Sequence, residues 1–213
     1  LTDRRLFASG TTSKLQVEGL TASGTDAASI SITNKQATVN APSIRFGKTR
    51  GTSIGSNTSV ADGDRLGRII FYGADGTDIY NATALIGAKV NGTVGTDTIP
   101  TDIVFETSTT TGSSRQERLR IASNGKILIG SNTPRNIGGP SALGHFQIEG
   151  LTGNTSSVSL INNQNNANGI AVLRFAKTRG TSDGAVTTVA DGDSLGGITF
   201  TGADGTDLLN STA

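Results

Sequence analysis

Apolar and polar residues alternate along much of this chain with a period of two, rather than the 3.6 of a helix. The segments that show this pattern, and so predict strands, are 29–33, 43–47, 84–90, 102–107, 118–122, 126–129 and 172–176. Asn-Gly and Asp-Gly pairs between them supply the positive φ angles that tight turns need. No stretch has helical periodicity longer than about two turns. The pattern therefore predicts an all-β protein.

One block of this pattern occurs twice. Residues 45–84 align without a gap with 174–213, and most aligned positions are identical. The spacing predicts tandem β-rich repeats of about 130 residues. The shared residues that we expect to define the repeat are Arg45, Phe46, Lys48, Arg50, Ile69 and Phe71 in the first copy, and Arg174, Phe175, Lys177, Arg179, Ile198 and Phe200 in the second.

The strand predicted around Ile69 shows which positions the repeat keeps. Ile69 and Phe71 recur as Ile198 and Phe200. The intervening residues change, from Arg68, Ile70 and Tyr72 to Gly197, Thr199 and Thr201. The residues on one face of the strand are identical in the two copies, whereas those on the other face differ, as expected of a strand that buries one face.

The repeat also predicts the domain organisation. We expect 1–13 to be the end of a preceding repeat, 14–131 the first repeat, 132–144 a linker rich in Pro and Gly, and 145–213 a second, truncated repeat. The second copy stops at Ala213, the counterpart of Ala84, and the chain has no Met. We therefore expect a piece of a longer protein, which an intact mass of 21.7 kDa would contradict.

The composition is poor in core-forming residues. Hydrophobic residues make up 34% and aromatic residues 4%, against the usual 45–50% or so apolar. Such a chain could be disordered, but the formal net charge of +1 and the regular alternation favour an ordered one. A chain with so few core-forming residues could be stable if identical chains wrap around a common axis and each contributes one face to a shared core. We therefore expect an elongated fibre, an intertwined homotrimer with a β-prism-like shaft or small knobs; a monomeric solenoid or sandwich is the alternative.

Charge, hydropathy and Cys content exclude several classes. The near-neutral charge argues against nucleic-acid binding, which normally uses a basic patch. No apolar run approaches the ~18 residues that predict a membrane span, so we expect no membrane insertion. Without Cys the chain can form neither a disulfide nor a thiolate metal site.

Acidic residues gather on predicted turns of both copies: Asp62, Asp64, Asp75 and Asp78, then Asp191, Asp193, Asp204 and Asp207. Calcium takes several oxygen ligands from flexible loops, although this spacing is not that of an EF-hand. Asp also stabilises turns by accepting hydrogen bonds from nearby backbone. We favour the turn-forming role and expect no cofactor, with calcium as the first alternative and a carboxylate pair for glycoside hydrolysis as the second.

A basic segment, 48–53, recurs as 177–182. It could hold an anion such as phosphate, although it lacks the Gly spacing of a phosphate-binding loop. The other interpretation, which we favour, is that Arg45, Lys48 and Arg50 pair with nearby Asp residues of the same or a neighbouring chain. The sole His, His145, has Lys14 as its counterpart, so it is no catalytic residue of the repeat. We therefore expect no enzyme activity.

The segment 117–130, ERLRIASNGKILIG, resembles a motif of tailed-bacteriophage tail-fibre and related appendage proteins. The block RFAKTRG…DGD-x-LG-x-I-x-F-x-GADGTD is similar to repeats in structural proteins of marine phages, cyanophages among them. The resemblance implies a virion appendage, usually a homotrimer, in or near receptor recognition, without catalytic residues. Its implied partners are identical chains, other virion proteins and a host surface glycan or protein. The alternatives are a bacterial surface adhesin and a polysaccharide-degrading tailspike.

Overall fold

The computed structural model describes residues 15, 17, 28–77, 79, 82–109, 114–135, 137, 144–165, 169–203 and 208. The chain divides into two compact units, Leu1–Gly125 and Lys126–Ala213, which are described in turn. All regular elements are strands, and the described residues contain no helix, so the predicted all-β class is confirmed. It follows that none of these residues belongs to a helix able to cross a membrane.

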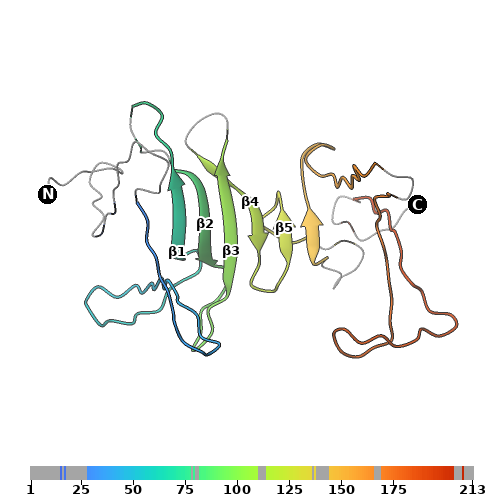
Figure 1. Ribbon diagram of the computed structural model, residues 1–213, viewed down its shortest axis with the longest axis horizontal. Coiled ribbons are helices and arrows are strands. Elements are labelled where there is room, and N and C mark those ends of the chain that lie inside the picture. The colour runs from blue at the N-terminus through green and yellow to red at the C-terminus, as the bar shows by residue number, and fades with distance from the viewer. Residues whose placement is uncertain are drawn as a thin grey trace. The chain divides into compact units, whose positions relative to one another are not determined.

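The first unit contains a four-stranded antiparallel sheet in which neighbours in sequence are neighbours in space. Its strands, side by side in Figure 1, are β1 (Arg65–Tyr72), β2 (Ala82–Val90), β3 (Thr101–Ser108) and β4 (Arg115–Ile121). The strands predicted at 84–90, 102–107 and 118–122 are therefore confirmed to within a few residues. Short connections make this meander, because each strand pairs with the segment that follows it.

The connection between β2 and β3 is a hairpin whose tight turn lies at Gly95–Thr98 rather than at the predicted Asn91-Gly92 pair. Gly92 has a φ of 130°, and the Asn91 amide donates to the Pro100 carbonyl at 2.9 Å. Farther out, Gly95 and Thr98 exchange two backbone hydrogen bonds, of 2.9 and 3.2 Å. Asp97, between them, has a φ of 56°, in the left-handed region that Asp tolerates better than most residues. The two strands are thus joined by a closed hairpin.

The register divides the sheet into two faces, because residues opposite each other in a ladder share a face. The apolar face holds Gly67, Ile69 and Phe71 of β1, Ala84, Ile86 and Ala88 of β2, Ile103, Phe105 and Thr107 of β3, and Gln116, Leu119 and Ile121 of β4. The ion-pair face holds Arg65, Arg68 and Ile70, then Leu85, Gly87 and Lys89, then Asp102, Val104 and Glu106, then Glu117 and Arg120.

Most buried side chains of this sheet lie on the ion-pair face, whereas fully buried Val90, at the end of β2 opposite Thr101, lies on the apolar-face side. Leu85 and Val104 are each 1% exposed and Asp102 is fully buried. Ile69 and Phe71, on the apolar face, are each 51% exposed. The small core of this unit therefore lies mainly on the face that carries the charges, with Val90 buried at one end of the other face.

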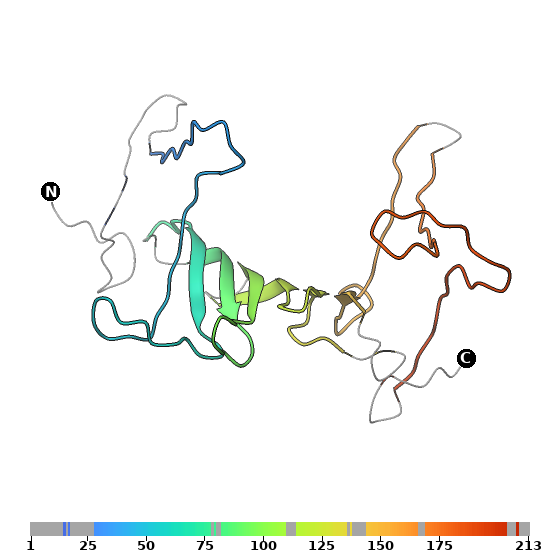
Figure 2. The same cartoon turned by 90° about the horizontal axis from the view of Figure 1, so that it is seen from below.

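The second unit contains a short parallel pair, β5 (Ile127–Ile129) and β6 (Phe146–Ile148). The Ile127 amide donates to the His145 carbonyl at 2.7 Å, and the Glu149 amide donates to the Ile129 carbonyl at 2.9 Å. The strand predicted at 126–129 is confirmed, and Leu128 is fully buried. The described parts of 150–203 carry no strand and appear as a plain trace in Figures 1 and 2.

Four predicted strands are wrong for the single chain. The segments 29–33, 43–47 and 172–176 are not in strands, and neither are Ile198 and Phe200. A strand needs a hydrogen-bonded neighbour, and in the described part of the chain none of these segments has one.

Candidate functional site

The acidic turn before β1 closes a lobe, residues 48–64, with an arginine fork. Arg50 donates from Nε to Oδ2 of Asp64 at 2.7 Å and from Nη2 to Oδ1 at 2.9 Å. The Ala61 amide donates to Oδ2 of Asp64 at 3.0 Å, and the Arg50 amide donates to the Thr58 carbonyl at 3.1 Å. A planar guanidinium suits this bidentate arrangement, which fixes orientation as well as distance.

The lobe of the second copy, residues 177–193, repeats these bonds. Arg179 donates from Nε and Nη2 to the two carboxylate oxygens of Asp193, at 2.8 and 3.0 Å. The Ala190 amide donates to Asp193 at 2.9 Å, and the Arg179 amide donates to the Thr187 carbonyl at 3.2 Å. The two lobes therefore share one hydrogen-bond plan, although 194–200 form no strand in the second copy.

The fork shifts the acid–base properties of both partners. The hydrogen bonds from Arg50, and then that from the Ala61 amide, hold the pKa of Asp64 well below its usual range. The same arrangement lowers the pKa of Asp193, chiefly through Arg179. Because a carboxylate hydrogen-bonded in its charged form stays ionised, both forks are intact at neutral pH.

Other predicted acidic residues also accept hydrogen bonds from the protein. Asp62 accepts from the Gly92 amide at 2.8 Å, which ties the lobe to the β2–β3 turn. Asp75 accepts from the Thr77 amide at 2.8 Å, within its own turn. The roles seen at Asp62, Asp64, Asp75 and Asp193 are thus turn and lobe contacts.

The predicted calcium ligands do not come together in the described part of the chain, where no three His, Cys, Asp or Glu side chains form a group able to hold a metal ion. Asp78, Asp204 and Asp207 lie outside the described residues. Calcium binding at the acidic turns stays a prediction.

The basic residues of the repeat behave differently from one another. Arg50 and Arg179 form the forks, as the ion-pair interpretation expects. Arg45 instead donates to the Ser43 hydroxyl at 3.2 Å, and Lys48 donates to the Thr49 carbonyl at 3.0 Å. Of the basic residues in the first lobe, Arg50 is therefore the one that closes it.

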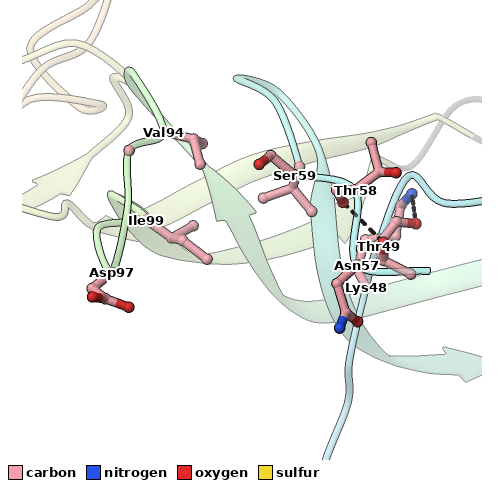
Figure 3. A pocket seen from close by; sticks show the side chains of 10 residues that line it. Lys48, Thr49, Asn57, Thr58, Ser59, Val94, Asp97 and Ile99 are labelled. Carbon is pink, nitrogen blue, oxygen red and sulfur yellow. Dashed lines mark hydrogen bonds between the residues drawn. The ribbon is translucent and has the colours of Figure 1, made fainter. Parts of the chain in front are cut away.

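A shallow pocket of about 540 Å³ lies between the first lobe and the β2–β3 hairpin. Its wall on the lobe side carries Lys48, Thr49, Asn57, Thr58 and Ser59, and Val94, Asp97 and Ile99 lie opposite, as Figure 3 shows. The Thr49 hydroxyl donates to the Thr58 carbonyl at 2.8 Å, which fixes one wall. No aromatic ring lines the pocket, so it offers no stacking surface for a sugar or a base.

An ion-pair network that sequence reasoning missed covers the ion-pair face. Fully buried Asp102 accepts from the Arg120 guanidinium, from Nδ2 of Asn91 at 2.7 Å and from the Ser123 amide at 2.8 Å. Arg120 also forks onto Glu117, at 2.6 and 2.7 Å. The only signal in the sequence was Asp102 beside an apolar run, which alternation assigns to solvent.

A second part of the network joins three strands of the same sheet. Glu106 of β3 accepts from Arg65 of β1 at 2.9 Å and from Arg115 of β4 at 3.3 Å. Leu85 lies opposite Glu106 in the register, and Val104 lies opposite Arg120. Long charged side chains cover apolar neighbours with their stems while their heads remain paired. This face is thus closed by the chain's own side chains.

The apolar face has no such cover in the described residues. Ile69, Phe71, Ile86, Ile103 and Ile121 are all exposed on it. Phe46 extends it, because the segment that carries Phe46 runs beside β1 in both views (Figures 1 and 2), and a Cβ on Gly67 would lie 2.5 Å from that of Phe46. The same approach recurs between Phe175 and Gly196, also at 2.5 Å.

The sequence matches no protein-family model and no curated protein. It is similar to a solved structure of the carboxy-terminal domain of the bacteriophage T5 L-shaped tail fibre, with 22% identity and a TM-score of 0.44, over 61% of this chain and 48% of that chain. It is also similar to the structure of that domain with its intramolecular chaperone domain, with 21% identity and a TM-score of 0.46, over 78% of this chain and 37% of that chain. The chain thus spans less than half the length of either tail-fibre structure.

Proposed function

We propose that this chain is a structural component of a phage virion appendage, a tail fibre or related fibre, in which identical chains share one core. The observation that carries the shared core is the exposure of apolar side chains along segments that alternate as strands but have no hydrogen-bonded neighbour among the described residues. The phage assignment rests on the resemblance of 117–130 and of the repeated block to appendage proteins.

The solvent-accessible surface is too large for a chain that folds alone. The chain exposes 17036 Å², whereas a folded monomer of 21.7 kDa exposes about 9,200 Å². Among the described residues the buried hydrophobic ones are Val60, Leu85, Val90, Val104, Ala122 and Leu128, and none of them lies in 150–203. The excess of about 7,800 Å² is larger than the roughly 2,000–5,000 Å² that obligate interfaces commonly bury.

The unpaired segments have the alternating sequence of strands, and their apolar side chains are exposed. Ile44 and Phe46 alternate with polar residues at 43–47, and all five residues are exposed. Leu173 and Phe175 repeat the pattern in the second copy and are exposed too. A row of free backbone groups with apolar side chains is a template for pairing with another chain. A homotrimer, in which each chain lends strands to the same axis, would provide that pairing.

The role we propose is structural rather than catalytic. The forks of both lobes engage Asp64 and Asp193 with arginine, and a guanidinium-paired carboxylate is a poor general acid. The partners we propose are identical chains, other virion proteins and, at the appendage's end, a host surface glycan or protein. The proposed location is the virion.

Antibodies against the chain, applied to purified phage particles in the electron microscope, test the proposal. They are expected to label a thin projection from the tail or capsid. Labelling of host cell envelopes and not of particles would contradict it and favour a bacterial surface adhesin. Release of reducing sugar from host polysaccharide by the purified chain would contradict the non-catalytic role and favour a tailspike.

A further inference from the structure

The two faces of β1 differ in how well their residues are kept between the two copies of the repeat. On the apolar face, Gly67, Ile69 and Phe71 recur unchanged as Gly196, Ile198 and Phe200. On the other side of the strand, Arg68 and Ile70 become Gly197 and Thr199. A strand keeps the face that packs and lets the solvent face vary.

The face that is kept is the one that the single chain leaves open. Ile69 and Phe71 are each 51% exposed, and Ile198 and Phe200 are 71% and 72% exposed. The opposite face, which varies, is closed by the chain's own ion pairs, with Asp102 fully buried there. The kept residues are thus suited to a contact that the isolated chain does not make.

The occupant must suit an uncharged surface. The apolar-face rows of β1–β4 hold no charged residue, and Phe46 adds a ring over Gly67. One charge reaches this face at its β4 edge, where Arg118 donates to the Thr107 hydroxyl at 3.1 Å. Such a face can pack against its own copy without bringing like charges together, a juxtaposition that costs several kcal/mol where it occurs. Since the same residues recur in the second copy, one kind of contact would serve both.

We propose that the apolar face of the β1–β4 sheet, centred on Ile69, Ile86 and Ile103, is the surface by which identical chains pack together, with the ion-pair face turned to solvent. This inference rests on the proposed function, and it adds which side of the sheet points to the shared axis. The 196–200 segment would present the same face once its strand is paired.

Single cysteines test which face is covered, because the chain has no native Cys. Ile69→Cys and Ile86→Cys place a thiol on the apolar face, and Arg68→Cys places one on the other side of the same strand as Ile69. The rate of modification by a small maleimide is measured in the native protein and in urea, beside the native mass. We expect protection of about tenfold or more at Ile69→Cys and Ile86→Cys, and little at Arg68→Cys.

The outcomes separate this inference from the proposed function. A native mass that is a multiple of the chain mass, with both apolar-face thiols protected, supports both. The same mass with reactive apolar-face thiols overturns the inference but still supports the proposed assembly of identical chains. A monomeric mass with reactive thiols overturns both, and a monomeric mass with protected thiols shows that the chain covers its own face. Ile86→Asp is expected to reduce the native mass to that of one chain, and an unchanged mass would also overturn the inference.

Discussion

Arg50 and Asp64 are fourteen residues apart, and their two parallel hydrogen bonds close the first lobe. The lobe has little apolar content of its own, and Ile54 near its tip is fully exposed. Its shape therefore depends on polar contacts, namely the fork, the Ala61 amide bond to Asp64 and the Thr49 hydroxyl bond to the Thr58 carbonyl. The same plan in 177–193 shows that the lobe is specified locally.

Arg50→Lys is expected to loosen the lobe. A lysine ammonium keeps the charge but cannot form the planar fork, so one of the two parallel bonds to Asp64 is lost. Hydrogen exchange of the Ala61 amide, which donates to Asp64, should become severalfold faster. Arg45→Lys is the matched control, because among the described residues Arg45 donates to the nearby Ser43 hydroxyl, at 3.2 Å, and not to a carboxylate. Equal exchange rates in the two variants would show that the fork does not hold the lobe.

Acid should open both lobes together. The pKa values of Asp64 and Asp193 are lowered in the folded chain, so their stabilisation is fully present above the unfolded Asp pKa of about 3.9. As the pH falls from there through the lower folded values, the carboxylates take up protons and that stabilisation is lost. Carboxyl ¹³C shifts of Asp64 and Asp193 measured from pH 6 to pH 2 should titrate below ordinary Asp. Midpoints near 3.9 would contradict the fork geometry.

At the scale of the elements, the β1–β4 sheet is held by charge on one face. Asp102 is fully buried, and its acceptor sites are filled by Arg120, Asn91 and the Ser123 amide. Removing one partner of a buried pair leaves a desolvated charge without compensation, which costs more than the intact pair contributes. The network is thus a strict requirement of this sheet.

Arg120→Ala should destabilise the protein by about 3–5 kcal/mol, because it leaves Asp102 buried without its cation. Urea unfolding at a fixed chain concentration measures the change. Arg118→Ala, two residues away on β4, removes an exposed arginine that donates to the Thr107 hydroxyl at 3.1 Å and should change stability by less than about 0.5 kcal/mol. Similar losses in both variants would mean that the buried network contributes nothing special.

Several elements could be predicted from the sequence, and the limits of that prediction have physical causes. Alternation located β2, β3 and β4, and Asn124-Gly125 located the turn after β4, because these signals are local. Alternation separates two faces but does not say which is covered, so the burial of Asp102 and Arg120 could not be predicted from it. The parallel pairing of β5 with β6 joins distant segments and leaves no local signature.

Around the candidate site, too, contacts between residues close in sequence could be predicted, whereas pairing with distant segments could not. The pairing of Arg50 with a nearby Asp was predictable, because the charges are close in sequence and recur at 179 and 193. The strand at 43–47 was predicted and is not formed in one chain. The alternation of side chains shows which face of a segment can be buried. It does not show which other segment will form backbone hydrogen bonds with it, and a strand needs such a neighbour.

At the scale of the whole molecule, folding and association are expected to be one event. Among the described residues the alternating segments 29–33, 43–47 and 172–176 are unpaired, and most of the apolar face of the sheet is open. When only the assembled state buries this surface, stability depends on chain concentration by mass action. Tandem repeats would then extend one shared core along an axis, which is the architecture of a fibre.

Sedimentation equilibrium of the purified chain, at two concentrations and neutral pH, tests the shared core most directly. The account predicts a mass three times the chain mass, with 21.7 kDa as the value for each 213-residue copy, and a melting temperature that rises with concentration. A compact monomer with the same β content at both concentrations would contradict it, because such a chain would have covered its apolar face without a second copy.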